Sequence, residues 1–366
     1  MSTFSLPSAA QVLEAGRKSM PALWRGVNLG NWLVLERWMQ PGLFAPYDVA
    51  DEYSLCAALG ASAERVMRRH RETFIRAEDF AWIRERGLNA VRIPVGYWLF
   101  EDDPPFVAQP EMLDQAIAWC DAYGLAANID LHGLPGFQSN EHHSGRRDHW
   151  RWPDDPDCLH RSLDFVEQIA QRYRDHPAVA AISVVNEPSP DIPAEALRTF
   201  YAQACERIRR YMSAEDVAVI IAAFTEARLP ELHRCLRGER NVLTDIHPYP
   251  CFVHWDQRRL ADYARWGIEQ HAPHVSGVGG DDLVIGEWSL GIARELRPQV
   301  AAMTDVDRNR FMRRFADGQL ASFNQTAGWF FWSYKVLVDD ALLRRCWSFR
   351  DATEMGWLPQ TWTSPG

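Results

Sequence analysis

Two glutamates in this chain lie at the ends of apolar, strand-like runs, where carboxyl groups can do chemistry. Glu187 stands in an Asn-Glu-Pro sequence, and Glu287 stands in Gly-Glu-Trp-Ser. Cleavage of a glycosidic bond needs such a pair: one protonated carboxyl donates to the leaving oxygen, and one ionised carboxylate attacks the anomeric carbon. A single glutamate at a strand end is more often a solvated loop residue, so the pair must be considered together with its surroundings.

Other strand-like runs also end in polar side chains, among them Arg92, His132 and His247. Taken singly, the arginine fits a structural ion pair, and each histidine fits a hydrogen-bonded core residue. If these ends meet at one mouth, Arg92 holds one of the two carboxyls ionised. Burial and the negative partner then raise the pKa of the other carboxyl, as acid catalysis requires.

Eight short runs rich in Val, Ile, Phe and Trp have the continuous apolar character of strands that are buried on both faces. They cover residues 24–33, 89–95, 125–132, 179–187, 217–224, 242–247, 283–288 and 328–334. Helix-period segments lie between them, several ended by a glycine such as Gly87 or Gly124. These segments cover residues 77–86, 112–123, 159–173, 194–211, 229–236, 257–270 and 307–323.

Eight strands that alternate with helices predict an α/β fold of the (β/α)8, or TIM-barrel, type, with its chemistry at the C-terminal ends of the strands. A doubly wound open sheet is the alternative, but residues 26–30 lack the spacing of its glycine-rich phosphate turn. We therefore predict one barrel domain over residues 24–366, preceded by an N-terminal extension, residues 1–23. An insertion, residues 36–76, follows the first strand.

The composition narrows the classes of function. The chain has 366 residues, a net charge of −10 and 12% aromatic residues. The acidic balance argues against a nucleic-acid partner, and no apolar stretch approaches the about 18 residues of a membrane span. The N-terminal residues lack the apolar run of a signal peptide, which predicts a cytoplasmic protein. The seven cysteines contain no C-x-x-C pair, so neither a disulfide framework, a metal site nor a cofactor is expected.

Several motifs in sequence order carry a resemblance to a known family. They are RGVNLGNWLVLERWMQPGLF (25–44), GLNAVRIPVGYW (87–98), NIDLHGLPG (128–136), VVNEP (184–188), IGEWS (285–289) and GWFFWSYK (328–335). Together they resemble glycoside hydrolase family 5, and within it the exo-β-1,3-glucanase type. The resemblance implies a retaining β-glycosidase that needs no cofactor and acts on β-glucosides or short β-1,3-glucan oligosaccharides by double displacement.

The resemblance also implies a role for each matched residue. Glu187 is expected to be the general acid/base and Glu287 the nucleophile, oriented by Arg92. Asn186 is expected to contact the sugar 2-hydroxyl, and Trp332 to stack under the sugar in the −1 subsite. The floor of that subsite is assigned to His132, His247 and Tyr249. Glu36 is expected to bind hydroxyls of the terminal sugar, which closes the pocket and makes the enzyme exo-acting.

Two features depart from the fungal exo-glucanase pattern. In the loop after the third strand, Glu141 and His142 stand where those enzymes carry an aromatic residue and an aspartate. After the first strand, Arg37-Trp38 follow Glu36, where those enzymes carry a proline and an aromatic residue. The linkage preference therefore stays open, and an endo-acting β-1,4-glucanase or mannanase is the alternative within the family. A carbohydrate-binding barrel without catalysis is the alternative outside the enzymes. The sequence leaves the oligomeric state open.

Overall fold

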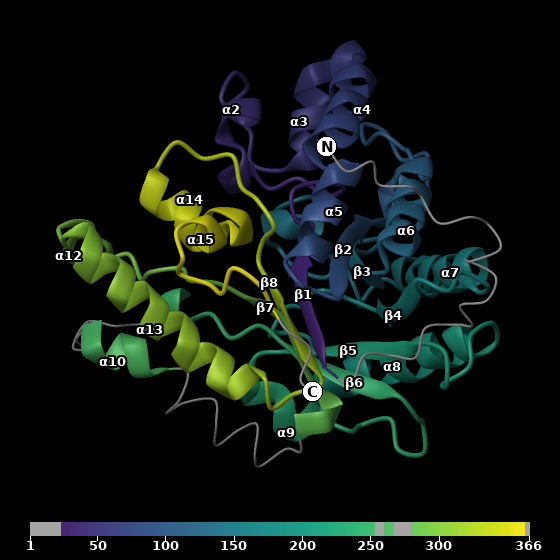
Figure 1. Ribbon diagram of the computed structural model, residues 1–366. Helices are drawn as coiled ribbons and strands as arrows, with labels where there is room; N and C mark the ends of the chain where they lie inside the picture. The colour runs from purple at the N-terminus through teal and green to yellow at the C-terminus, as the bar shows by residue number, and fades with distance from the viewer. Residues whose placement is uncertain (1–22, 253–259, 267–279, 363–366) are drawn as a thin grey trace.

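The computed structural model describes residues 23–252, 260–266 and 280–362. Eight parallel strands form a closed barrel in sequence order, and β1 pairs with both β2 and β8 to close it (Figure 1). The strands are β1 Trp24–Asn28, β2 Ala90–Gly96, β3 Ala126–Gly133, β4 Val179–Ser183, β5 Ala218–Phe224, β6 Val242–Ile246, β7 Leu283–Trp288 and β8 Gly328–Phe331. The predicted fold and the predicted strand order are confirmed.

Several strands end earlier than their apolar runs. β1 ends at Asn28, β4 at Ser183 and β8 at Phe331, although the hydrophobic pattern continues beyond each of them. Beyond β1 and β4 the backbone enters the left-handed region, with φ of 59° at Asn31 and 39° at Glu187. That conformation lies outside the extended region of regular strands. The chain therefore leaves the barrel at its C-terminal mouth and turns its side chains inward.

Helices surround the barrel, as alternation with parallel strands requires (Figure 1). They are α2 Pro41–Phe44, α3 Glu52–Leu59, α4 Ala63–Phe74, α5 Ala77–Glu85, α6 Glu111–Tyr123, α7 Pro156–Tyr173, α8 Ala194–Arg209, α9 Leu229–Leu232, α10 Leu260–Trp266, α12 Arg297–Ala301, α13 Asp305–Phe323, α14 Ala341–Trp347 and α15 Phe349–Glu354. Gly124 ends α6 in the left-handed conformation, as predicted. The predicted helix at 257–270 is described only as α10, and its flanks lie outside the described residues.

The insertion after β1 forms a small layer with its own apolar cluster. Leu35, Phe44, Leu55 and Met67 are fully buried in that cluster. Beneath it lies an ion pair with no exposed surface, in which Arg71 Nη2 of α4 lies 3.1 Å from Glu52 Oε1 of α3. Glu52 also accepts the backbone N–H of Leu35 at 2.9 Å. The ion pair therefore fixes the segment that follows β1.

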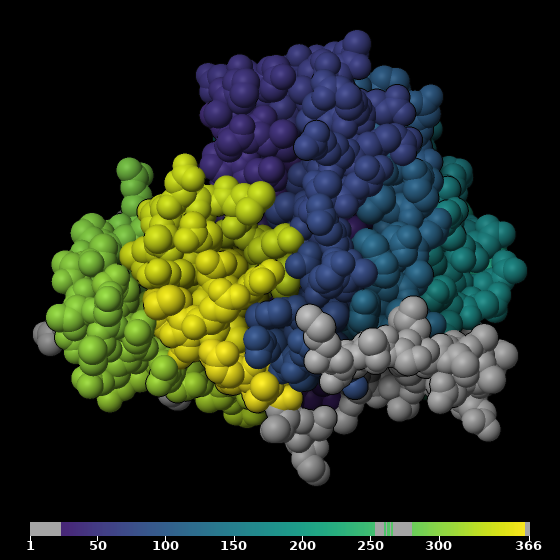
Figure 2. Space-filling model, turned by 45° about the horizontal axis from the view of Figure 1, so that its top comes forward, coloured from purple at the N-terminus to yellow at the C-terminus, as the bar shows by residue number. Residues whose placement is uncertain are grey.

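The C-terminal helices pack against the first third of the chain. Figure 2 shows this C-terminal segment in yellow beside the blue helices. The Tyr334 hydroxyl donates to Asp79 at 2.8 Å, and Trp362 N–H donates to the Arg86 carbonyl at 2.7 Å. These contacts join both ends of the described chain into one domain. The predicted extension, residues 1–23, lies almost wholly outside the described residues.

None of the described helices combines the length and the apolarity needed to cross a bilayer.

We expect replacement of Arg71 by methionine to destabilise the fold. Removing one partner of a buried ion pair leaves the other charge uncompensated, which costs about 3–5 kcal/mol. Urea denaturation should show this loss in the free energy of unfolding. Arg68→Met is the matched control on the same helix, because Arg68 pairs with Glu64 and Glu111 at the surface and such pairs contribute at most about 1 kcal/mol. Equal losses in the two variants would contradict a stabilising role for the buried pair.

Candidate active site

A cavity of about 770 Å³ opens at the C-terminal mouth of the barrel. Seven of the nine predicted site residues line it: Glu36, His132, Asn186, Glu187, Tyr249, Glu287 and Trp332. The other two lie just behind the wall, where Arg92 contacts Glu287 and His247 contacts Glu187. The tertiary structure thus gathers residues from loops and strands that are up to about 300 positions apart in the sequence.

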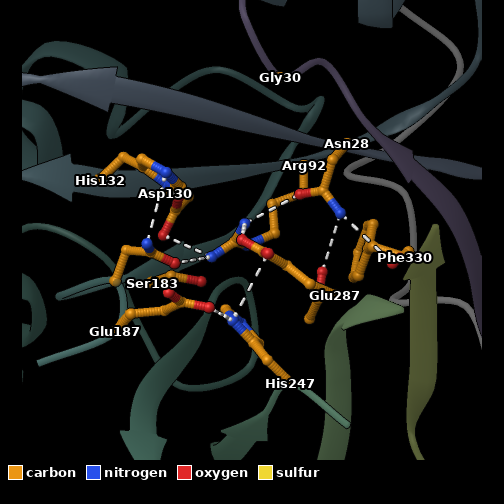
Figure 3. A network of polar contacts seen from close by, with 12 residues as sticks. Asn28, Gly30, Arg92, Asp130, His132, Ser183, Glu187, His247, Glu287 and Phe330 are labelled. Atoms are coloured by element: carbon orange, nitrogen blue, oxygen red, sulfur yellow. Dashed lines mark hydrogen bonds and ion pairs between the residues drawn. The ribbon is translucent and has the colours of Figure 1, made fainter. Parts of the chain in front are cut away.

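Arg92 of β2 is fully buried at the centre of this group (Figure 3). Its Nη1 donates to Glu287 Oε1 at 2.9 Å and to Asn28 Oδ1 at 2.9 Å. Its Nη2 donates to Asn186 Oδ1 at 2.8 Å and lies 3.0 Å from Asp130 Oδ1. The planar guanidinium therefore fixes the orientation of the Glu287 carboxylate and of the Asn186 amide together.

The carboxyl groups of Glu187 and Glu287 face one another across the cavity. A carboxylate oxygen of each lies within 4.8 Å of the other. Retaining glycosidases separate their two carboxyls by about 5–5.5 Å, and inverting enzymes leave about 6.5–9.5 Å for a water molecule. Glu187 has a positive φ of 39°, which is uncommon for a non-glycine residue.

Each carboxyl has its own set of neighbours. Glu287 Oε2 accepts the hydroxyl proton of Tyr249 at 2.9 Å. Glu187 Oε1 lies 2.6 Å from His247 Nδ1, and its Oε2 lies 3.3 Å from His143 Nδ1. Glu287 is thus bonded to a guanidinium and a phenol, whereas Glu187 lies between two imidazoles.

Glu187 and Glu287 titrate as an interacting pair, because both carboxyls are buried and lie close to one another. Burial raises the pKa of Glu287 to about 7, against the lowering effect of His247 and Arg92. Burial also acts to raise the pKa of Glu187, but His143 and His247 outweigh it and lower that pKa to about 2. Arg92 contacts Glu287, whereas the two histidines that lower the pKa of Glu187 come from other parts of the chain.

Glu36 lies in the same cavity and is almost fully buried. Its Oε2 accepts Trp38 Nε1–H at 2.7 Å and lies 3.2 Å from His142 Nε2. Burial acts to raise the pKa of Glu36, but the hydrogen bond and charge of His142, together with His132 and His143, lower it below its usual value. The residues that depart from the fungal pattern therefore anchor Glu36 at the cavity wall.

Aromatic side chains form another part of the cavity wall. Trp38 and Trp347 lie edge to face with ring centroids 5.0 Å apart, and Tyr249 lies 5.4 Å from Trp347. Phe252 beside them is 76% exposed, which is unusual for a large apolar side chain. Of the 16 tryptophans in the chain, Trp38, Trp332 and Trp347 line the cavity. Flat apolar faces of this kind suit the faces of sugar rings.

Sequence reasoning missed several polar residues of the site. Asp130 lies 2.6 Å from His132 Nδ1, and Asp245 lies 3.3 Å from His247 Nε2. A signal for both was present, because each aspartate precedes its histidine by two positions on a strand and so points to the same side. His143 had no such signal, since a loop carries it to Glu187.

Among the described residues, one set of three metal-binding side chains comes together: Glu187, His247 and Glu287. Glu287 is bonded to the positive Arg92, and His247 is bonded to Glu187. These groups already satisfy one another, and a guanidinium beside the set opposes a further cation. The contacts of this set therefore fit hydrogen bonding among its own members and Arg92 better than a metal ion.

Comparison with known proteins identifies the family. The family model of cellulase (glycosyl hydrolase family 5) matches residues 62–336. The chain belongs to glycosyl hydrolase family 5. A probable glucan 1,3-beta-glucosidase A of Emericella nidulans is 32% identical over 93% of this chain and 90% of its own length. A glucan 1,3-beta-glucosidase of Kluyveromyces lactis is 31% identical over 93% of this chain and 89% of its own.

Solved structures support the barrel of this family 5 glycosyl hydrolase. The rutinosidase from Aspergillus niger superposes with a TM-score of 0.76 at 18% identity, covering 93% of this chain and 98% of that chain. A structure titled AoRut gives a TM-score of 0.77 at 19% identity with the same coverage. The predicted family and glycosidase activity are confirmed by the family match and the sequence relatives.

The predicted cytoplasmic location is wrong. The relatives of this glycosyl hydrolase are fungal glucan 1,3-beta-glucosidases, and that comparison overturns the prediction. The prediction rested only on the lack of an apolar run near the N-terminus, and the absence of such a run does not establish a compartment.

We expect the activity of this glycosyl hydrolase to depend on pH through the carboxyl pair. Hydrolysis requires one protonated and one ionised carboxyl, and two interacting groups lose their protons in two steps that belong to the pair. The singly protonated pair exists between a pKa of about 2 and a pKa of about 7. A profile of kcat/KM with a chromogenic β-glycoside should therefore fall as the pH rises through about 7. Unchanged kcat/KM well into the alkaline range would contradict this dependence.

Proposed function

We propose that this chain is a retaining, exo-acting β-glucosidase that releases single sugars from the non-reducing end of β-glucosides or short β-1,3-glucan oligosaccharides. The observation that carries the proposal is the approach of the Glu187 and Glu287 oxygens to within 4.8 Å in the cavity that also contains Glu36. Residues 24–366 form the catalytic unit in this proposal, and residues 1–23 precede it.

In the first step Glu287 attacks the anomeric carbon, and the bond to the leaving oxygen breaks while Glu187 protonates that oxygen. In the second step Glu187 takes a proton from water, and the water oxygen displaces Glu287 with overall retention. Arg92 orients Glu287 through its 2.9 Å hydrogen bond, and Tyr249 bonds the other oxygen. Bound in this way, Glu287 is pre-organised for attack and does not reorient during the reaction.

The remaining cavity residues bind the sugar in this proposal. Asn186 lies next to Glu187 with its amide oxygen bonded to Arg92 and its NH2 nitrogen 3.4 Å from His132 Nε2. In this proposal the other N–H of that group donates to the substrate 2-hydroxyl. His132 and Trp332 stack with an interplanar angle of 8°, which supports a flat wall for the −1 sugar. Their rings are buried and fixed, so that sugar binding requires little ordering of side chains.

Exo action rests on Glu36. A buried carboxylate must receive hydrogen bonds, and one oxygen of Glu36 already accepts from Trp38. The hydroxyls of a terminal sugar can donate to the carboxylate, whereas an internal sugar has a glycosidic oxygen at the linked position and no proton to donate. The names of the sequence relatives, glucan 1,3-beta-glucosidases, support the same choice over an endo-acting β-1,4-glucanase or mannanase.

Substitution of each glutamate separates the two roles. Glu287→Gln should abolish turnover while leaving ligand binding nearly intact, because the isosteric amide fills the same space without being a nucleophile. Glu187→Gln should lose about 10²–10⁴-fold in kcat/KM on unactivated glycosides, the usual contribution of general acid catalysis. It should spare kcat/KM for dinitrophenyl β-glucoside, whose leaving group needs no proton. Equal losses of Glu187→Gln on both substrates would contradict the assignment.

Products formed from an end-labelled β-1,3-glucan oligosaccharide test the exo assignment. Wild-type enzyme should release single sugars from the first time points, and mixed internal fragments would instead indicate endo action.

Glu36→Ala should lower kcat/KM by the factor that corresponds to a loss of about 1.5–3 kcal/mol of transition-state binding, because a hydrogen bond to a charged group contributes that much. Glu64→Ala, in the same insertion but at the protein surface, is the control and should retain wild-type kcat/KM.

A further inference from the structure

The wall of the active-site cavity carries an arginine, Arg297, that takes no part in the function proposed above. It lies in the segment after β7, at the first position of α12. The charged groups of the lining are otherwise carboxyls and histidines, and Arg297 is the single lysine or arginine among the lining residues that the structure describes. A fixed positive charge therefore marks one part of this cavity.

The guanidinium of Arg297 is held in place but not used up. The side chain is half-buried, and its Nε donates to the Ile292 carbonyl at 3.0 Å. Within the described part of the chain, neither Nη1 nor Nη2 has a hydrogen bond or an ion pair with a carboxyl group. The two Nη groups thus present a pair of N–H donors at the end of the guanidinium, a geometry that binds a carboxylate through both of its oxygens.

A second cavity of about 180 Å³ adjoins the first one at this arginine. Arg297 and Leu343 line both cavities, and the wall of the smaller one is mostly apolar, with Ile292, Ala301 and Leu342 among its residues. Figure 1 shows α12 and α14, which contribute to this wall, on the same side of the barrel. An apolar cavity of roughly 150 Å³ can hold a benzene ring. Space for a flat apolar group therefore lies beside the guanidinium.

Aromatic side chains connect this region with the reacting centre. Phe252 and Trp347 lie with ring centroids 6.3 Å apart, and Trp347 lies 5.4 Å from Tyr249, whose hydroxyl bonds the proposed nucleophile. The charge of Arg297 acts on the same wall, because burial raises the pKa of the Cys251 thiol and Arg297 opposes that effect. The wall from Tyr249 to Arg297 is thus aromatic and apolar, with one positive charge.

The order of the strands places Arg297 away from the negative side of the mouth. Glu36 follows β1 and Glu141 follows β3, whereas Arg297 follows β7, which stands opposite β3 in the closed barrel. Asp340 lies on the wall of the smaller cavity, but its Oδ1 accepts two backbone N–H groups at the start of α14, at 2.9 and 3.0 Å. Its charge is therefore partly compensated by the helix, and Arg297 stays open to an external anion.

We propose that Arg297 binds a carboxylate on the leaving group, so that this enzyme accepts β-glucosides whose aglycone is an aromatic acid. The inference rests on the proposed function, in which the terminal sugar occupies the Glu36 side and the leaving group extends from the other side. The aromatic ring lies against the apolar wall of Phe252, Trp347 and Leu343, and its carboxylate accepts the N–H groups of Nη1 and Nη2. Arg297 determines specificity at a distance from the reacting atoms.

Two aryl glucosides that differ in charge test this assignment. Para-carboxyphenyl and para-carbamoylphenyl β-glucoside have similar shapes, but only the first carries a carboxylate. Arg297→Gln should lower kcat/KM for the carboxyphenyl substrate by roughly tenfold, as expected for a hydrogen-bonded ion pair at a half-buried position. For the carbamoylphenyl substrate the decrease should be less than about threefold. Each variant is compared with wild type on the same substrate, so that differences in leaving-group reactivity cancel.

The form of the loss and its salt dependence are further readouts. The contact is the same in the ground state and the transition state, so Arg297→Gln should raise KM for the carboxyphenyl substrate more than it lowers kcat. Salt should weaken the binding of this substrate to wild-type enzyme, because it screens the ion pair. Arg294→Gln is the matched control, since Arg294 is an exposed arginine of the same segment that lines neither cavity. It should leave kcat/KM for both substrates unchanged.

A neutral disaccharide distinguishes a carboxylate from sugar hydroxyls as the partner of Arg297. With a β-1,3-linked glucose disaccharide, Arg297→Gln should lose much less kcat/KM than with the carboxyphenyl substrate. A loss of the same size on the disaccharide would overturn the proposal, because Arg297 would then bind hydroxyls. So would a loss that does not distinguish the two aryl glucosides, or the absence of any loss on the carboxyphenyl substrate.

Failure of the proposed function would look different. In that case wild-type enzyme hydrolyses none of the three substrates, or Glu287→Gln retains turnover. Titration calorimetry with the Glu287→Gln enzyme tests Arg297 without turnover. Addition of Arg297→Gln to that enzyme should weaken the binding of the carboxyphenyl glucoside by roughly tenfold and that of the carbamoylphenyl glucoside by less than about threefold. Unchanged binding of the carboxyphenyl glucoside would remove the role of Arg297 and leave the catalytic assignment intact.

Discussion

The guanidinium of Arg92 has no exposed surface and bonds four partners, Glu287, Asn186, Asn28 and Asp130, which come from different strand ends or the loops beyond them. A buried cation needs such compensation, since each unpaired charge in the interior is costly. The same bonds fix the carboxylate of Glu287, the proposed nucleophile, and keep the Asn186 amide beside it. The geometry of the mouth therefore depends on the barrel, because the partners of Arg92 come from β1, β3, β7 and the segment that follows β4.

The barrel mouth contains more carboxyl groups than Arg92 can neutralise, and histidines make up the difference. His132 pairs with Asp130, while His247 lies among Asp245, Glu187 and Glu287. Burial acts to raise the pKa of both Glu187 and Glu287, and the histidines beside Glu187 lower the pKa of that carboxyl.

The parts of the chain that depart from the fungal pattern are those that shape the sugar end of the cavity. Trp38 and His142 both contact Glu36, one from the insertion after β1 and the other from the loop after β3. The buried Glu52–Arg71 pair supports the same segment from below through Leu35. Specificity at that end is therefore controlled by loops, whereas the chemistry is controlled by strand ends, as is usual for this architecture.

The sequence by itself determined the barrel, the order of its strands and the residues at their ends, because continuous apolar runs and period-3.6 patterns are local and the strand ends of a barrel must converge. It also contained Asp245 and Asp130, readable from their spacing to His247 and His132. Only the tertiary structure decided which histidines face Glu187, because His143 arrives on a loop whose path no periodicity specifies. The division of charge between Glu187 and Glu287 was decided there too, since pKa values depend on burial and on distances of a few ångströms between groups remote in the chain.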